Sequence, residues 1–180
     1  MRWEALFADL EARLAAGDEA EFDAEVAERA RHEVAAMSLA DRLRAHAGRD
    51  VALGLSDGGH ARGRVVGAGV DVVVLAGAGE VRCLVPLRAI TVMSGLGPAG
   101  LTEASVVLSR LGLRHALGGL ARARLPVRVA TTHGEVAGVV HRVAADHIDV
   151  CRRVPGGDLD VSAIVDTVPL AAVVAVRSAV

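Results

Sequence analysis

Aromatic side chains are almost missing from this 180-residue chain. It has one Trp, two Phe and no Tyr, and these three residues, Trp3, Phe7 and Phe22, all lie in the first 22 positions. An aromatic cage or a base-stacking platform needs rings, so neither can be built after residue 22. Apolar residues still make up 52% of the chain, because Ala, Val and Leu supply them, and this content excludes intrinsic disorder.

Lysine is absent and cysteine is scarce. All twenty basic residues are Arg, which indicates a GC-rich genome more than a particular chemistry. Cys83 and Cys151 form no CxxC pair and are too few for a disulfide framework, so we expect reduced, buried thiols in a cytosolic protein. No signal peptide is expected, since Glu4, Asp9 and Glu11 interrupt the first apolar stretch.

The chain also has no long hydrophobic run. The longest late stretch without charge, 167–176, contains Pro169 and is about half of a bilayer span. We therefore expect a soluble cytoplasmic protein with no membrane contact. Charge is uneven: residues 1–47 carry eleven acids and six Arg, whereas residues 48–180 carry eleven acids and fourteen Arg. The acidic part is expected to meet basic surface of the same protein or its copy, with a separate basic partner as the alternative.

Residues 1–47 predict an acidic helical hairpin. Apolar residues spaced by three and four form one stripe over 2–16, and Gly17 followed by Asp18 ends that helix and begins another. The sequence 38–41 resembles a capping box for a third short helix. The apolar seam of the hairpin is our candidate surface for self-association, with packing on its own domain as the alternative. The candidate residues are Trp3, Phe7, Leu10, Leu14, Phe22 and Val26.

After residue 50 the pattern changes to short Val-rich segments separated by Gly. Of 29 Val residues, only Val26 and Val34 precede this point, and β-branched residues favour strands. Five strands joined by tight turns are typical of a small barrel. The predicted strands are 51–55, 63–66, 71–75, 81–86 and 89–93.

The same order of elements then recurs. The strand at Gly63 is matched at Gly138, and the strand at Asp71 is matched at Asp146 by the same shift along the chain. The most specific match, at a slightly larger shift, pairs Val85-Pro86-Leu87-Arg88-Ala89-Ile90 with Val168-Pro169-Leu170-Ala171-Ala172-Val173. This recurrence predicts an internal duplication.

The repeats resemble Sm-like small β-barrels. In the first repeat the matching stretches are Leu53-x-Leu55-x-Asp57-Gly58, Gly63-x-Val65, Asp71-Val72-Val73-Val74-Leu75 and Ile90-Thr91-Val92-Met93-Ser94-Gly95. The resemblance implies a barrel topology. Sm-like proteins bind RNA in oligomeric rings, but here Asp71 stands in the place of their Asn and Ser94 in the place of their Arg. The RNA site is therefore not carried over.

The chain as a whole resembles a family of actinobacterial proteins, some of whose members are described as Fis-type transcriptional regulators. The resemblance runs from Met1-Arg2-Trp3-Glu4 and Leu6-Phe7-Ala8-Asp9-Leu10-Glu11 to the two Val-Pro-Leu elements. The sequence contains no helix-turn-helix with a basic recognition helix, so this resemblance does not predict sequence-specific DNA reading.

A Gly/Pro-rich joint and a basic helix separate the repeats. The joint contains Gly95-Leu-Gly97-Pro-Ala-Gly100, which fits the dinucleotide fingerprint GxGxxG, but the acid expected about 20 residues later is missing. No nucleotide cofactor is therefore expected. The segment that follows is the most basic of the chain. Its candidate nucleic-acid contacts are Arg110, Arg114, Arg122, Arg124 and Arg128.

Histidines and acids gather in the second repeat. His133, His141 and His147, with Asp146 and Asp149, are the densest group of ligand-type residues, but no pair has a zinc-motif spacing. We interpret these histidines as surface residues and expect no metal. Catalytic motifs such as GxSxG and HExxH are also absent, so we expect no enzyme activity.

Together these observations predict an α+β protein, with an N-terminal helical hairpin followed by two tandem small Sm- or SH3-like β-barrels joined by a helical linker. The expected parts are the acidic hairpin (1–47), the first barrel (48–95), the joint and basic helix (96–125) and the second barrel (126–180). The expected function is a non-enzymatic protein-interaction or scaffold module that binds a protein partner or itself as a homo-oligomer. The alternative is an RNA- or DNA-binding regulatory protein that uses the Arg-rich linker helix and the barrels.

Overall fold

The chain consists of two compact units, residues 1–38 and residues 39–180. The computed structural model describes residues 25–29, 31–32, 35–77, 81–97, 111–152 and 164–179. In the first unit, the described residues between 25 and 36 are helical and the side chains of 25–29 are exposed. Most of the predicted hairpin, including all of its seam except Val26, lies outside the described residues.

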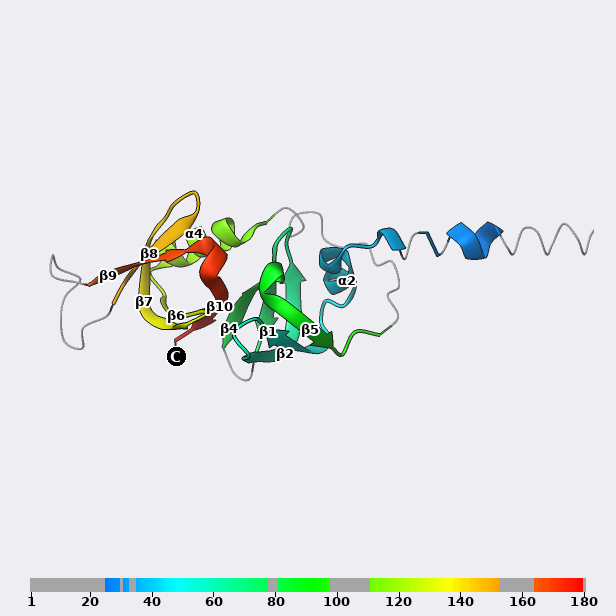
Figure 1. Ribbon diagram of the computed structural model, residues 1–180, viewed down its shortest axis with the longest axis horizontal. Helices are drawn as coiled ribbons and strands as arrows, with labels where there is room; N and C mark the ends of the chain where they lie inside the picture. Colours follow the sequence, from blue (N-terminus) through cyan, green and yellow to red (C-terminus); the bar gives the residue numbers. More distant parts are fainter. Residues whose placement is uncertain are drawn as a thin grey trace, which may run out of the picture. The chain divides into compact units, whose positions relative to one another are not determined.

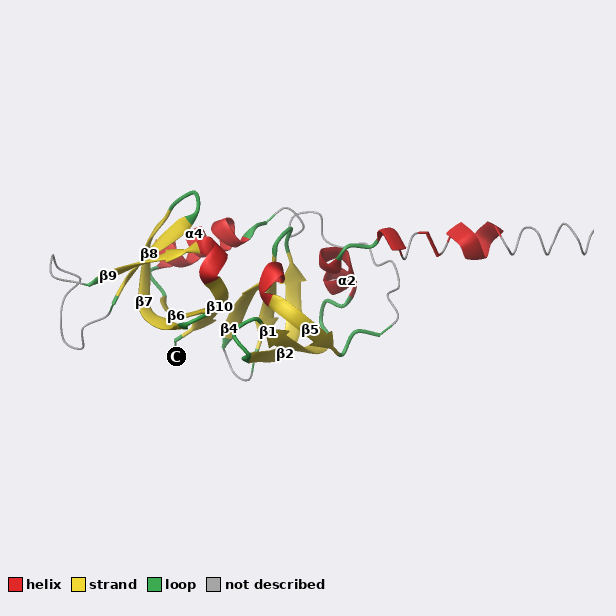
Figure 2. Cartoon of the chain, viewed as in Figure 1, coloured by secondary structure: helices red, strands yellow, loops and turns green. Residues whose placement is uncertain are grey.

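The second unit is built mainly of strands (Figures 1 and 2). In chain order its elements are α2 (Leu39–Ala45), β1 (Asp50–Leu55), β2 (His60–Ala68), β3 (Val72–Ala76), β4 (Arg82–Pro86), the 3₁₀ helix η1 (Leu87–Ala89), β5 (Ile90–Ser94), α4 (Leu113–Ala123), β6 (Pro126–Thr131), β7 (Gly134–Val143), β8 (His147–Cys151), β9 (Val165–Pro169), the 3₁₀ helix η2 (Leu170–Ala172) and β10 (Val173–Ser178).

Within the described residues, ten strands form one open antiparallel sheet in the order β5-β1-β2-β3-β4-β10-β6-β7-β8-β9. The predicted architecture, a helical hairpin followed by two small closed barrels with a helical linker, is therefore wrong. Closure would require β4 to pair with β5 and β9 to pair with β10. Instead β4 pairs with β10, so the two halves share one sheet and only short helices accompany it.

The two halves of the sheet have the same internal strand order. The order β5-β1-β2-β3-β4 in the first half corresponds to β10-β6-β7-β8-β9 in the second. The register of β2 with β3 shifts between Val65 and Gly67, and that of β7 with β8 shifts at the equivalent place, between Val140 and Arg142. The duplication itself remains a prediction, but this correspondence lets equivalent positions be compared.

The recurring Asp and Val-Pro-Leu motifs form the same contact in both halves. Each Val-Pro pair ends a strand, and the residues that follow it form a single 3₁₀ turn. The backbone N–H of Leu87 in η1 donates to the carbonyl of Asp71 at 2.8 Å, and that of Leu170 in η2 donates to the carbonyl of Asp146 at 2.6 Å. These motifs therefore tie each 3₁₀ turn to the loop that precedes β3 or β8.

Two apolar clusters fill the second unit, and β10 contributes to both. Val174 and Ala175 pack with residues of the first half, whereas Val173 and Val176 pack with residues of the second. Helix α4 covers the second cluster with Leu113 and Leu117, which are 2% and 0% exposed. No described aromatic residue contributes to either cluster, so the apolar area that folding buries here comes mainly from Ala, Val, Leu and Ile.

In the described part of the chain, no helix combines the length and the apolar character that crossing a bilayer requires.

Candidate interaction surface

The joint between the halves is the pairing of β4 with β10. Leu84 lies opposite Val176, and Cys83 lies opposite Arg177. The backbone N–H of Arg82 donates to Ser178 Oγ at 3.1 Å. Burial raises the pKa of the Cys83 thiol, and the nearby Arg177 guanidinium partly offsets this effect.

Arg88 connects the same joint from the first half. It lies on η1, and its Nη2 donates to the carbonyl oxygen of Leu170 and, at 3.3 Å, to that of Val173. Arg177 Nη2 donates to the His60 carbonyl oxygen at 3.4 Å. Side chains from each half therefore bind backbone oxygens of the other half, in addition to the strand pairing.

The outer strands of the sheet, β5 and β9, each pair on one side only within the described residues. Exposed apolar side chains lie on or beside both strands. Val92 on β5 is 62% exposed, Val165 on β9 is 49% exposed, and Ile164, just before β9, is 60% exposed. An unpaired strand presents N–H and C=O groups that can pair with another strand. The two edges are therefore candidate surfaces for strand addition.

The burial of β10 shows how strongly packing against the other half affects exposure. Val174 and Ala175 on β10 are 1% and 0% exposed. Their counterparts in the first half, by alignment of the two Val-Pro-Leu motifs, are Thr91 and Val92 on β5, and both are exposed. Equivalent positions are thus buried on β10, where the first half packs against them, and exposed on β5, at the outer edge of the sheet.

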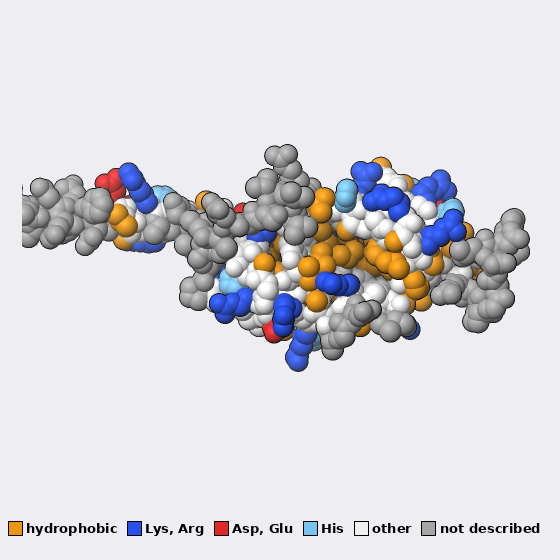
Figure 3. Space-filling model, turned by 180° about the vertical axis from the view of Figure 1, so that it is seen from behind, with side chains coloured by type: hydrophobic (Ala, Val, Ile, Leu, Met, Phe, Trp, Pro, Cys, Tyr) orange, Lys and Arg blue, Asp and Glu red, His pale blue; other side chains and the backbone are white. Residues whose placement is uncertain are grey.

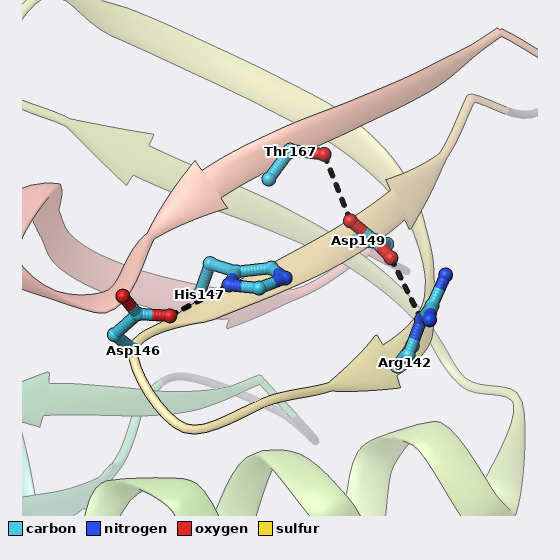
Figure 4. Close-up of polar contacts among 5 residues, drawn as sticks. All are labelled: Arg142, Asp146, His147, Asp149 and Thr167. Atoms are coloured by element: carbon cyan, nitrogen blue, oxygen red, sulfur yellow. Dashed lines mark hydrogen bonds and ion pairs between the residues drawn. The ribbon is translucent and has the colours of Figure 1, made fainter.

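A polar group lies beside β9 (Figure 4). Asp149 on β8 is 6% exposed; its Oδ1 accepts a hydrogen bond from Thr167 Oγ1 at 2.8 Å, and its Oδ2 accepts one from Arg142 Nε at 3.0 Å. The Thr167 hydrogen bond, with a further contribution from Arg142, holds the pKa of Asp149 below its ordinary value. This group attaches β9 to β8 and β7.

Arg152 and Asp166 form a second cross-strand contact at this edge. Arg152 Nη2 donates to Asp166 Oδ1 at 3.2 Å and its Nε donates to Oδ2, and this pairing raises the pKa of Arg152. Bidentate pairs of this kind are geometrically specific. Asp166 therefore has a defined position on β9.

A basic pocket lies next to α4. It has a volume of about 400 Å³ and is lined by Arg122, Arg124 and His141 together with apolar residues and Cys151. Within the described part of the chain, none of these three basic side chains takes part in an ion pair. In the reversed view of Figure 3, Arg and His side chains gather at the end of the sheet unit that carries α4. The pocket offers donors for an anionic group.

A second shallow pocket, of about 800 Å³, lies across β1, β2, β3 and β5. Its charged lining residues are Asp50, Arg62 and Arg64. In this pocket Arg62 and Arg64 flank Gly63. Val139, which follows the equivalent Gly138, lines the α4 pocket, so the two pockets include equivalent places of the two halves. Arg62 and Arg64 were not among the predicted site residues, although the alternation of Arg around Gly63 on one strand could have indicated them.

The structure brings together only part of the predicted nucleic-acid set. Arg122 and Arg124 share the pocket, Arg114 lies on α4, and Arg128 on β6 forms an ion pair with Glu135 at 3.0 Å. Arg110 lies outside the described residues, as do the seam residues Trp3, Phe7, Leu10, Leu14 and Phe22. Val26 is described and is 49% exposed.

The histidines of the second half do not converge. His133 contacts the hydroxyl of Thr132, His141 lines the α4 pocket, and His147 Nδ1 lies 2.7 Å from Asp146 Oδ1. The His147 contact lowers the pKa of Asp146. Among the described residues, no three His, Cys, Asp or Glu side chains are grouped as metal ligands would be.

No protein-family model matches the chain, and no curated protein matches its sequence.

Proposed function

We propose that this protein is a non-enzymatic interaction module that self-associates through the outer strands of its sheet. The observation that carries the proposal is the pair of outer strands, β5 and β9, each with exposed apolar side chains on or beside it. Strand addition uses backbone hydrogen bonds for affinity and the facing side chains for specificity, and it requires no reactive group.

The side chains of β5 explain why a partner would be favoured at this edge. Protected edges carry charged residues that oppose pairing. The described β5 strand has none, since its residues are Ile90, Thr91, Val92, Met93 and Ser94. Covering Val92, which is 62% exposed, would remove apolar area from water.

Charged substitutions at the edges test the proposal. Val92→Lys and Val165→Lys place a solvated cation on β5 and on β9, and sedimentation velocity measures the mass of the full chain before and after each change. Val70→Lys is the matched control, because Val70 is 58% exposed and lies in the turn between β2 and β3. We expect both edge variants to reduce self-association and the control to retain it. A monomeric parent chain, or equal loss in all three variants, would refute the proposal.

The N-terminal seam is a separate predicted surface for self-association. A double substitution, Trp3→Ala with Phe7→Ala, tests it in the full chain by the same mass measurement. Retained association in this variant, together with loss in the Val92→Lys variant, would assign self-association to the sheet edges alone.

A second candidate function is binding of nucleic-acid phosphates, which the α4 pocket favours. Arg122 and Arg124 line it with His141 and have no ion-pair partner among the described residues. Phosphate contacts weaken steeply as salt rises. Binding of a mixed RNA and DNA pool at low salt, followed by a salt titration, tests this candidate. Arg122→Glu with Arg124→Glu should abolish binding, whereas Arg49→Glu should not. Binding that survives the double reversal would exclude the pocket as the site.

A further inference from the structure

The two strands that have no outer partner among the described residues are the counterparts of the two strands that pair in the joint. When the two Val-Pro-Leu motifs are aligned, β9 corresponds to β4 and β5 corresponds to β10. One copy of the chain therefore contains both members of a second, unformed joint. They are the two outermost strands of the sheet and are not paired with each other in the structure.

We propose that β9 of one copy pairs with β5 of the next in the register of the β4–β10 joint. The inference rests on the proposed self-association and names its geometry. In the joint, Leu84 lies opposite Val176 and Cys83 lies opposite Arg177. In the same motif alignment, these pairs become Thr167 opposite Met93 and Asp166 opposite Ser94.

The backbone of β9 presents the right groups for this register. Arg152 follows the last residue of β8, and Ile164 precedes the first residue of β9. The N–H of Arg152 donates to the carbonyl of Ile164 at 3.0 Å, so Arg152 and Ile164 form a hydrogen-bonded pair between the two strands. Hydrogen-bonded and non-hydrogen-bonded pairs alternate along an antiparallel ladder. The N–H and C=O groups of Val165 and Thr167 therefore point away from β8, as those of Arg82 and Leu84 point from β4 toward β10.

The burial of the equivalent strand supports a second copy as the partner. Ala175, which is 0% exposed in the joint, is the counterpart of Val92, which is 62% exposed. A copy of β9 seated against β5 would cover Val92 as β4 and its half cover Ala175. The pairing is head to tail, because each copy contributes a different strand to the two contacts it makes.

One contact of the internal joint is missing from the intermolecular one. Arg88 bridges to carbonyl oxygens of η2 and β10, but its counterpart is Ala171, which is exposed and has no side-chain donor. We therefore expect association between copies to be reversible and weaker than the internal joint. An arginine at position 171 would reach the carbonyl oxygens of Leu87 and Ile90 on the next copy.

Disulfide trapping tests the register. Ser94→Cys and Asp166→Cys are made in separate chains that carry Cys151→Ser, and the two chains are mixed and oxidised. Positions 94 and 166 form a non-hydrogen-bonded pair in the proposed register. The Cα atoms of such a pair lie about 4.5 Å apart, so a disulfide can form between them. In the matched control, Val92→Cys takes the place of Ser94→Cys. Position 92 is out of register along the same strand, and it would lie about 7–8 Å from position 166 of the other copy.

The outcomes separate the inference from the proposed function. Fast cross-linking of the Ser94/Asp166 mixture, with slow cross-linking of the control and of each variant alone, supports the head-to-tail register. Dominant Ser94–Ser94 or Asp166–Asp166 cross-links would overturn the inference, because the edges would then pair with their own kind while self-association persists. A chain that stays monomeric would overturn both.

A gain of affinity provides an independent test. Ala171→Arg should tighten self-association about tenfold, since hydrogen bonds from a charged donor are stronger than neutral ones. Ala137→Arg is the control, because Ala137 is exposed on β7, outside both edges, and the change adds the same charge there. The register would be overturned if Ala171→Arg gave no gain in affinity and the Ser94→Cys and Asp166→Cys chains also failed to cross-link.

Discussion

The carboxylate Oδ1 of Asp71 accepts a hydrogen bond of 2.7 Å from the backbone N–H of Leu113, which is distant in the chain. Leu113 is the first residue of α4, and the residue before it, Gly112, has no side chain to cap the helix. Asp71 therefore supplies the cap from the turn between β2 and β3, and its negative charge meets the positive end of the helix dipole. The contact fastens the connecting helix to the first half of the sheet.

Removal of this cap should destabilise the protein. Asp71→Ala is expected to lower the free energy of unfolding by about 1 kcal/mol, because the N–H of Leu113 loses its acceptor. Urea denaturation followed by circular dichroism measures the change. Asp146→Ala is the control, since Asp146 is the counterpart of Asp71 and its side chain contacts the neighbouring His147 instead of a helix end. Equal losses in the two variants would contradict the capping role.

Two glycines at equivalent positions should resist substitution. A Cβ on Gly63 would lie 2.4 Å from the carbonyl oxygen of Ala76, and one on Gly138 would lie 2.1 Å from that of Cys151. Because both neighbours are backbone atoms, the strands must move, and we expect Gly63→Ala and Gly138→Ala each to cost about 1–3 kcal/mol of unfolding free energy.

Gly119 provides the control for these glycines. It lies in α4, and a Cβ there would meet nothing within 4 Å. Gly119→Ala should stabilise the protein by up to about 1 kcal/mol, because Ala favours the helix. The same urea titration measures all three changes. A neutral effect of Gly63→Ala would show that the β2–β3 spacing adapts more freely than the structure indicates.

The hydrogen bond from Thr167 should control the ionisation of Asp149. The pKa of Asp149 is lower in the folded protein than its ordinary value of about 3.9, so the ionised carboxylate stabilises the fold above that pH. This contribution is lost as the pH falls through the lowered pKa. Thr167→Val should raise the pKa of Asp149, because the Thr167 hydrogen bond is the largest single cause of its lowering, and Arg142→Gln should raise this pKa as well.

NMR titration of the Asp149 carboxyl carbon measures these pKa values directly. Acid unfolding gives a second readout, since Thr167→Val should weaken the dependence of stability on pH in the acidic range. An unchanged pKa of Asp149 in Thr167→Val would contradict the role assigned to this hydrogen bond.

The two cysteines should differ in reactivity. Cys83 is 7% exposed, and burial raises the pKa of its thiol, so little thiolate is accessible to a reagent. Cys151 is half-buried at the end of β8. We expect an alkylating reagent to label Cys151 first and Cys83 only slowly, as followed by mass spectrometry of peptides. Equal labelling rates would mean that the β4–β10 joint opens readily.

Local patterns in the sequence identified most of the strands but not their partners. Alternating Val and Leu residues located β1, and the Val-Pro-Leu motif marked the ends of β4 and β9. These features depend on neighbouring residues, which periodicity detects. The pairing of β4 with β10 depends on contacts between residues from opposite halves of the chain. Because β5 and β10 follow the same motif, the sequence could not distinguish closure of each half from exchange between halves.

The candidate surfaces were only partly predictable for the same reason. The basic character of Arg122 and Arg124 was visible in the sequence, whereas their proximity to His141 depends on how α4 packs on β7. The exposed edges at Val92 and Val165 could not be predicted at all, because the expected closed barrels would have paired both strands on each side. The cap that Asp71 provides was also missed, because Asp71 and Leu113 are distant in the chain.

Sedimentation equilibrium of the unmodified full chain over a wide micromolar range tests the central claim most directly. The account predicts a concentration-dependent mass above that of the 18.5 kDa monomer, which returns toward the monomer mass in the Val92→Lys variant. A mass of one chain at every concentration would contradict self-association through the sheet edges.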